Sequence, residues 1–208
     1  MNNIEKLFVD SPSATHFAKG YFNYLGNVMG SLDAEAIGAF VKLLLDARER
    51  NARIFFIGNG GSAATASHFA NDIGIGTRTL ERPFRALSLC DNNAVLTAIA
   101  NDYGYEDIFV QQLKTMMFSG DVVVGISASG NSPNIIRAME YASANGAQTV
   151  GLSGFDGGKL RSLVSISLHV PSEKGEYGPV EDVHMIFDHL IGAYLGLLVK
   201  KQAVENSR

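Results

Sequence analysis

From residue 52 onward, short apolar runs rich in β-branched side chains alternate with segments long enough to form helices. The five runs are Arg53 to Ile57, Phe84 to Leu89, Asp121 to Ile126, Gln148 to Leu152 and Val164 to Val170. Apolar strands separated by helices are typical of a parallel sheet with helices packed on both faces. The sequence therefore predicts an α/β fold, a three-layer sandwich around five parallel strands.

Residues 13–51 contain no strand-like run, and their apolar side chains recur at helical spacing, as at Ile37, Phe40 and Leu44. We expect two helices there, divided near residues 30–33. A last helix is expected from about Glu181 to Lys201, after the helix breakers Gly175 and Gly178-Pro179. The chain divides into a helical segment over 1–51, which packs in an oligomer, and a sheet-containing part over 52–208, together one structural domain.

Charged residues make up only 18% of the chain, below the roughly 25% of average soluble proteins, which favours an oligomer that buries extra surface. The net charge of −4 argues against a dedicated nucleic-acid-binding protein. A single cysteine, Cys90, excludes an internal disulfide. The N-terminus lacks the pattern of a signal peptide, and the longest apolar run, residues 190–199, is about half of a bilayer span. We expect a cytoplasmic protein without a membrane partner.

The first predicted strand ends in the glycine-rich loop 58–62, Gly-Asn-Gly-Gly-Ser, directly before a helix-like segment. Glycines there let backbone N–H groups approach an anion at the positive end of the helix. The pattern Gly58, Gly60, Ala63 also matches a dinucleotide fingerprint, although Asp91 lies beyond the usual position of its acid. A phosphate site, a dinucleotide site and a simple tight turn all remain open at this loop.

The third predicted strand ends in the serine-rich loop 127–132, Ser-Ala-Ser-Gly-Asn-Ser, and Pro133 opens the next helix. Ser132 suits a helix N-cap, but capping does not explain Ser127, Ser129 and Asn131. If the strand order is 2-1-3-4-5, both loops line one crevice, which favours a phosphorylated small molecule over a dinucleotide. Between the loops, Asn101-Asp102 either caps a helix or contacts sugar hydroxyls.

Two predicted helices carry further candidates. His68 and Asp72 lie four residues apart after the glycine-rich loop, hence on one helix face. On the last helix, Glu181 and His189 lie roughly on one side, and His184 and Asp188 form another pair four residues apart. Such residues are most often ordinary surface or core polar groups, and the sequence by itself does not bring the two helices together.

Four ordered motifs resemble those of the sugar isomerase (SIS) domain family, and more narrowly of its phosphoheptose isomerases. They are the glycine-rich loop with His68, residues 101–104 (Asn-Asp-Tyr-Gly), residues 125–132 around the serine-rich loop, and residues 152–159 (Leu-Ser-Gly-Phe-Asp-Gly-Gly-Lys). The resemblance implies a flavodoxin-like or Rossmann-like five-stranded sheet with an N-terminal helical hairpin. It also implies isomerisation of sedoheptulose 7-phosphate to D-glycero-D-manno-heptose 7-phosphate through an enediolate, for surface-glycan heptose such as that of lipopolysaccharide.

Residue by residue, the resemblance implies three sets of functional residues: a substrate-binding set, a set of metal ligands and an acid–base pair. The substrate-binding set is Asn59, Gly60, Gly61, Ser62, Asp72, Asn101, Asp102, Ser127, Ala128, Ser129, Ser132 and Glu181. The metal ligands, for one zinc ion per subunit, are His68, Asp72, Glu181 and His189. The acid–base pair is Asp72 and His189. Family members are homotetramers with sites where subunits meet.

This sequence departs from the family pattern at two positions: Asp72 stands where Glu is usual, and Glu181 where Gln is usual. The shorter Asp72 withdraws the carboxylate by roughly 1 Å, which can cost on the order of 100-fold in rate unless the backbone compensates. The added charge of Glu181 strengthens the attraction for a dication.

Two other classes of protein are alternatives to the isomerase. One is a non-catalytic SIS tetramer that associates with the bacterial replication initiator, for which joint retention of His68, an acid at 72 and His189 has no purpose. The other is a phosphosugar-sensing regulator, which normally carries a DNA-binding domain that 208 residues do not accommodate. The retained polar set favours the enzyme.

Overall fold

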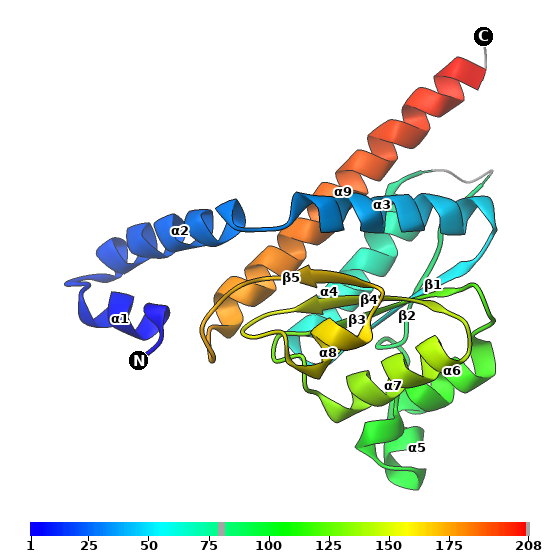
Figure 1. Cartoon of the computed structure of the whole chain (residues 1–208), viewed down its shortest axis with the longest axis horizontal. Helices are drawn as coiled ribbons and strands as arrows, with labels where there is room; N and C mark the ends of the chain where they lie inside the picture. The colour runs from blue at the N-terminus through cyan, green and yellow to red at the C-terminus, as the bar shows by residue number, and fades with distance from the viewer. Residues whose placement is uncertain (79–81, 207–208) are drawn as a thin grey trace.

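The computed structural model describes residues 1–78 and 82–206 (Figure 1). Its strands are β1 (Arg53–Gly58), β2 (Arg85–Ser88), β3 (Val122–Ser127), β4 (Gln148–Ser153) and β5 (Ile166–His169). Its helices are α1 (Asn3–Val9), α2 (Ala14–Gly30), α3 (Ala34–Glu49), α4 (Gly61–Asn71), α5 (Asn93–Asp102), α6 (Val110–Met116), α7 (Pro133–Ala144), α8 (Gly158–Leu163) and α9 (Tyr177–Asn206). A π-helical turn, η1 (Asp72–Gly76), continues α4, and a 3₁₀ turn, η2 (Tyr105–Asp107), follows α5.

The five strands form one sheet in the order β2-β1-β3-β4-β5, and every neighbouring pair is parallel. This confirms the predicted strands and the order 2-1-3-4-5. In the register, Gly58 at the end of β1 pairs with Ile126 near the end of β3. The glycine-rich and serine-rich loops therefore leave adjacent strands at the same edge, where the direction of winding switches.

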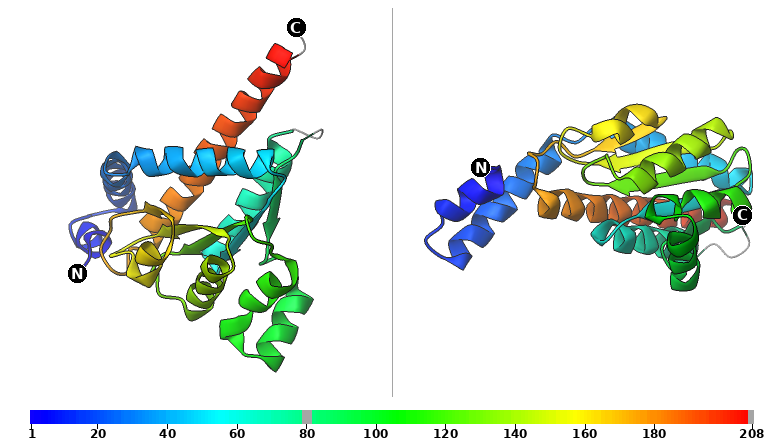
Figure 2. Two further views of the ribbon diagram at one scale, coloured as in Figure 1. Left: turned by 45° about the vertical axis from the view of Figure 1, so that its right-hand side comes forward. Right: turned by 90° about the horizontal axis from the view of Figure 1, so that it is seen from below.

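Helices cover both faces of the sheet, as the three-layer prediction requires (Figure 2). One face packs against α3, α4 and α9, through side chains such as Phe40, Phe69 and Phe187. The other face packs against α6, α7 and α8, through Leu113, Met139 and Leu160. The core thus holds α4 and α9 side by side under one face, and these two helices carry the titratable candidates.

The two helices predicted within residues 13–51 are confirmed as α2 and α3, with Ser13 and Asp33 as their N-caps. The structure adds α1, which the sequence reading did not predict. It also corrects the last helix, which begins at Tyr177 rather than near residue 181 and continues to Asn206. Gly178 and Pro179 lie in its first turn, where proline is tolerated because that turn has no intrahelical N–H bonds to lose.

By length and composition, Tyr177–Glu205 could cross a membrane, with a mean hydropathy of 1.3. Its place in this fold is in the core. Buried side chains recur every three or four residues along α9, at Val180, Val183, Phe187, Ile191, Leu195 and Val199. That stripe packs against the sheet face and α3, so the apolar character of α9 is that of a core helix.

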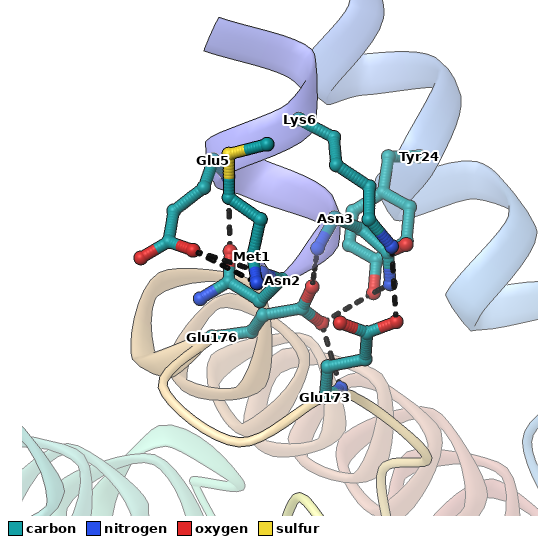
Figure 3. Close-up of polar contacts among 8 residues, drawn as sticks. All are labelled: Met1, Asn2, Asn3, Glu5, Lys6, Tyr24, Glu173 and Glu176. Carbon is teal, nitrogen blue, oxygen red and sulfur yellow. Dashed lines mark hydrogen bonds and ion pairs between the residues drawn. The ribbon is translucent and has the colours of Figure 1, made fainter. Parts of the chain in front are cut away.

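A buried glutamate ties the N-terminal helices to the start of α9 (Figure 3). Glu176, which is 1% exposed, accepts hydrogen bonds from the backbone N–H of Asn3 at 2.7 Å and from the Tyr24 hydroxyl at 2.5 Å. It also accepts the backbone N–H of Glu173 at 2.9 Å. One carboxylate therefore joins α1, α2 and the segment before α9.

Replacing Glu176 by alanine is expected to lower the free energy of unfolding by about 3 kcal/mol, because hydrogen bonds to a buried charge are lost and their donors are left unpaired. Urea unfolding measures the loss, and amide hydrogen exchange of α1 should rise with it. The matched control is Glu173→Ala: that side chain is about half exposed and lies 3.6 Å from Lys6. It should cost no more than about 1 kcal/mol. Equal losses in the two variants would contradict the anchoring role of Glu176.

Candidate functional site

The glycine-rich loop is shaped by close backbone approach. A Cβ on Gly58 would lie 2.3 Å from the carbonyl oxygen of Ser62, so no side chain fits there. Gly60 has φ of +54°, in the region that glycine adopts without strain. The turn therefore brings the chain directly into α4, with Gly60 at the N-cap position and Gly61 as the first helical residue.

The side chain of Asn59 is held in one orientation by two neighbours. It exchanges two hydrogen bonds with Asn134, at 2.9 and 2.8 Å, and its Oδ1 accepts the Tyr105 hydroxyl at 2.9 Å. Asn134 is 1% exposed at the start of α7. The sequence reading missed Asn134, although its position two residues after Ser132, at the mouth of the same crevice, was a usable signal.

In the serine-rich loop, two hydroxyls lie at the N-terminus of α7. Ser132 occupies the N-cap position, yet its side chain makes no capping bond. Its Oγ instead lies 3.1 Å from that of Ser127. Ser129 accepts the backbone N–H of Asn131 at 3.3 Å. The pair Ser127 and Ser132 thus offers hydroxyls beside the positive end of a twelve-residue helix.

The loop that follows β4, residues 154–159, braces the serine-rich loop through hydrogen bonds. The side-chain oxygen of Asn131 accepts the backbone N–H of Lys159 at 3.1 Å, and its amide donates to the Ser129 carbonyl at 3.0 Å. The carbonyl of Ala128 accepts the N–H of Gly154 at 2.9 Å. The side chain of Asn131 therefore has a structural role, because it holds the serine-rich loop against residues 154–159. Ala128 contributes to the same contact through its backbone carbonyl.

Four titratable side chains from α4, η1 and α9 converge in one group: His68, Asp72, Asp188 and His189. One ligand-type atom from each lies within 4.8 Å of all the others. His68 Nε2 is 3.6 Å from Asp72 Oδ2 and 3.9 Å from Asp188 Oδ2, and the two imidazole rings meet edge to face at 5.1 Å. The helix pairing that the sequence left open is therefore present, and it includes Asp188, which was not among the expected ligands.

The π-helical turn η1 begins at Asp72. Such turns are rare and are frequent at functional sites. A Cβ on Gly192 of α9 would lie in ordinary contact with the Cβ of Asp72, at 3.5 Å, so α9 passes directly beside this turn. The Asp72 carboxylate lies there beside His68 and Asp188.

Two residues in this region are completely buried. His184 and Asp188 are 0% exposed, and among residues 1–78 and 82–206 their polar side-chain atoms have no hydrogen-bond partner. Burial lowers the pKa of His184 to about 4, which keeps the ring neutral. Burial, with a further contribution from the Asp72 charge, raises the pKa of Asp188 to about 7, while His189 acts in the opposite direction.

The remaining expected residues lie outside this group. The Glu181 carboxylate lies against the glycine-rich loop, because a Cβ on Gly61 would be 2.6 Å from its Oε2. Asn101 and Asp102 are exposed at the end of α5, where the Asn101 amide donates to Asp102 at 2.8 Å. The capping alternative for this pair is wrong, since the following η2 has no side-chain cap and Asn92 caps α5.

A doubly wound sheet with two polar loops at its switch point and a His/Asp group on the adjoining helices defines an α/β domain that takes a small ligand at this edge. A family model described as "SIS domain" matches residues 20–154. The chain belongs to the SIS domain family, and curated relatives place it in a narrower group within that family.

The relatives that support this narrower grouping are curated proteins. A phosphoheptose isomerase of Helicobacter pylori (strain Shi470) is 42% identical over 152 residues, which are 73% of this chain and 78% of that protein. One from Geobacter sulfurreducens is 40% identical over 79% of this chain and 87% of its own length. Within the SIS family, the chain therefore belongs to the phosphoheptose isomerases. This grouping favours the enzyme over the non-catalytic initiator-associated class.

Solved structures agree with the fold. The phosphoheptose isomerase GmhA from Neisseria gonorrhoeae superposes with a TM-score of 0.78 at 28% identity, covering 88% of this chain and 98% of that one. A phosphoheptose isomerase from Francisella tularensis gives a TM-score of 0.76 at 23% identity, which by itself shows the shared fold.

Proposed function

We propose that this protein isomerises sedoheptulose 7-phosphate to D-glycero-D-manno-heptose 7-phosphate in the cytoplasm, as a step toward heptose for surface glycans such as lipopolysaccharide. The observation that carries the proposal is the convergence of Asp72 and His189 from separate helices in a chain 42% identical to a named phosphoheptose isomerase. The ligand-type atoms of the Asp72 carboxylate and the His189 imidazole lie within 4.8 Å of each other. Such a pair can divide between them the proton transfers that an aldose–ketose isomerisation requires.

The substrate phosphate is assigned to the serine-rich loop. Ser127, Ser129 and Ser132 supply hydroxyl donors, Ala128 supplies backbone, and the N-terminus of α7 supplies a favourable dipole. The glycine-rich loop, Asn59 to Ser62, and Asn101 with Asp102 contact the sugar. Phosphate held at one end of a seven-carbon chain orients the carbonyl end, which lowers the entropic part of the barrier.

Proton transfer is assigned to Asp72 as base and His189 as acid. Asp72 removes a proton from C1 while His189 protonates the C2 oxygen. His189 then accepts the proton of the C1 hydroxyl as Asp72 returns its proton to C2, which gives the aldose and restores both side chains. The Asp72 carboxylate is about a quarter exposed, 28% for its side chain, so a substrate can reach it from the open side of the group. Its neighbour Asp188 is closed to solvent and is not accessible to a substrate carbon.

The group also fits a metal ion, because two imidazoles and two carboxylates meet there and the buried oxygens of Asp188 have no hydrogen-bond donor among the described residues. Nitrogen and oxygen donors in such a set suit zinc. When bound, zinc supplies a Lewis acid that polarises the sugar carbonyl or hydroxyl. His68 and Asp72 hold it on the side of α4, and His189 on the side of α9.

A homotetramer with sites between subunits is part of the proposal. Large apolar side chains are exposed on two parts that extend away from the sheet, the α1–α2 hairpin and the C-terminal half of α9 (Figures 1 and 2). They are Phe8, Val9, Phe22, Tyr194 and Leu197. Exposed apolar surface of this kind is typical of an interface between subunits, and light scattering of the purified protein measures the assembly.

The proposed activity is tested by incubating the purified protein with sedoheptulose 7-phosphate in D₂O, with and without added zinc, and following the products by NMR. We expect a heptose 7-phosphate carrying solvent deuterium at C2, because the proton passes through a group that exchanges with water. Sedoheptulose without phosphate is the matched control and should turn over poorly. Absence of turnover under both metal conditions would overturn the isomerase and favour the non-catalytic initiator-binding class.

A further inference from the structure

Asp188 is placed where a carboxylate is unfavourable unless something compensates its charge. Its side chain is 0% exposed, and neither oxygen has a hydrogen-bond partner within residues 1–78 and 82–206. A carboxylate removed from water is strongly destabilised when it is not paired. The side chain therefore needs a cation or a donor close to its two oxygens.

The neighbouring protein groups do not supply that partner. His68 Nε2 is 3.9 Å away, beyond hydrogen-bond distance, and its side chain is 42% exposed. Asp72, the other carboxylate of the group, is also an acid and supplies no positive charge to Asp188. A divalent cation bound among the four side chains would compensate the charge of Asp188 and bind one of its two oxygens.

Glu181, which the family resemblance places in the metal site, points elsewhere. Seven residues separate it from Asp188, which is about 10 Å along the helix axis but only about 20° around it. The two acids thus lie on one stripe of α9, two turns apart. The Glu181 carboxylate ends against Gly61 at the glycine-rich loop, whereas Asp188 lies level with His68 and Asp72.

We propose that Asp188, and not Glu181, completes the metal site of this chain, so that the ion is held by His68, Asp72, Asp188 and His189. This inference rests on the zinc site of the proposed function. Four-coordinate zinc with bonds of about 2.0–2.1 Å separates neighbouring ligand atoms by about 3.3–3.4 Å. The distances of 3.6 and 3.9 Å from His68 to the two carboxylates are already close to that spacing. Glu181 remains at the glycine-rich loop, in reach of the sugar.

The assignment is tested by metal binding in the absence of sugar. The metal-free protein is titrated with Zn²⁺ against a chromophoric chelator, and with Co²⁺ while its visible absorption is recorded. Asp188→Asn should weaken Zn²⁺ binding by about 100-fold or more and change the Co²⁺ spectrum. Glu181→Gln makes the same chemical change on the same helix stripe. It should bind Zn²⁺ within about threefold of the unmodified protein, as expected for one distant screened charge.

Thermal unfolding in chelator separates loss of a ligand from loss of the fold. Without metal, Asp188→Asn should be at least as stable as the unmodified protein, because a buried unpaired carboxylate has been removed. Added Zn²⁺ should then raise the melting temperature of the unmodified protein and of Glu181→Gln, but not of Asp188→Asn. Loss of binding in Glu181→Gln, unchanged binding in Asp188→Asn, or no binding by the unmodified protein would each overturn the assignment. None of these outcomes depends on isomerase turnover.

Discussion

Replacing Asp72 by asparagine is expected to lower the turnover of sedoheptulose 7-phosphate by about 10³-fold, because an amide cannot accept the proton that must leave the sugar carbon. The substrate phosphate is held at the serine-rich loop, so KM should change little and the loss should appear in kcat. Turnover is measured at saturating zinc, so that any weaker metal binding by asparagine does not limit the rate. The rate of deuterium exchange into the ketose should fall in parallel, since the same step is removed.

The matched control is Asp46→Asn, which makes the same change at an exposed aspartate of α3. It should retain the kinetics of the unmodified protein. Asp72→Glu, which restores the residue usual in the family, should keep activity if the carboxylate can adjust within the π-helical turn. Turnover of Asp72→Asn within tenfold of the unmodified protein would contradict the assignment of Asp72 as the base.

The fold could be predicted from the sequence because its determinants are local and periodic. The strand β3, residues 122–127, is buried along its whole length, and such a continuous apolar run is recognisable without any partner. The strand order is not fixed by the sequence pattern: 2-1-3-4-5 is the order that would bring the two polar loops to one crevice, and the structure has that order. The sequence predicts the start of α9 too late, because Gly178-Pro179 resembles a helix breaker. In the first turn of a helix, however, proline replaces an N–H that has no partner.

Of the candidate site, the sequence predicts only the parts that belong to one loop or to one face of one helix. His68 with Asp72 is a local spacing, and His189 was found through the resemblance. Asp188 was passed over because its importance depends on burial and on the approach of α4 to α9, which no spacing within α9 reveals. Asn134 is a similar case, since its bonds to Asn59 join segments 75 residues apart.

The two departures from the family pattern have different outcomes in the structure. Asp72, one methylene shorter than the usual residue, still lies 3.6 Å from His68, and it does so at the first residue of a π-helical turn. Glu181 is directed to the glycine-rich loop, and a second carboxylate two turns along takes the position beside the histidines. We infer that the two acids of α9 have different roles: Glu181 contacts the sugar, and Asp188 binds the metal.

Replacing Gly130 by alanine is expected to have the largest effect among changes away from the titratable group. Gly130 has φ of +64°, and a Cβ on it would lie 2.0 Å from the carbonyl oxygen of Gly157. The backbone conformation alone should cost about 2 kcal/mol in the free energy of unfolding, and the overlap must in addition push the serine-rich loop away from its brace. A displacement of about 1 Å at Ser129 and Ser132 should lower kcat/KM by about 100-fold.

The control is Gly26→Ala in the middle of α2, where an added Cβ meets no atom within 4 Å. That change should raise the free energy of unfolding by up to about 1 kcal/mol, since alanine is the better helix former, and leave the kinetics unchanged. The comparison uses urea unfolding and steady-state kinetics on both variants. Because the phosphate anchors the substrate, the loss in Gly130→Ala should be much smaller for phosphate-free sedoheptulose. A kcat/KM for the phosphorylated sugar within twofold of the unmodified protein would show that the serine-rich loop does not position the phosphate.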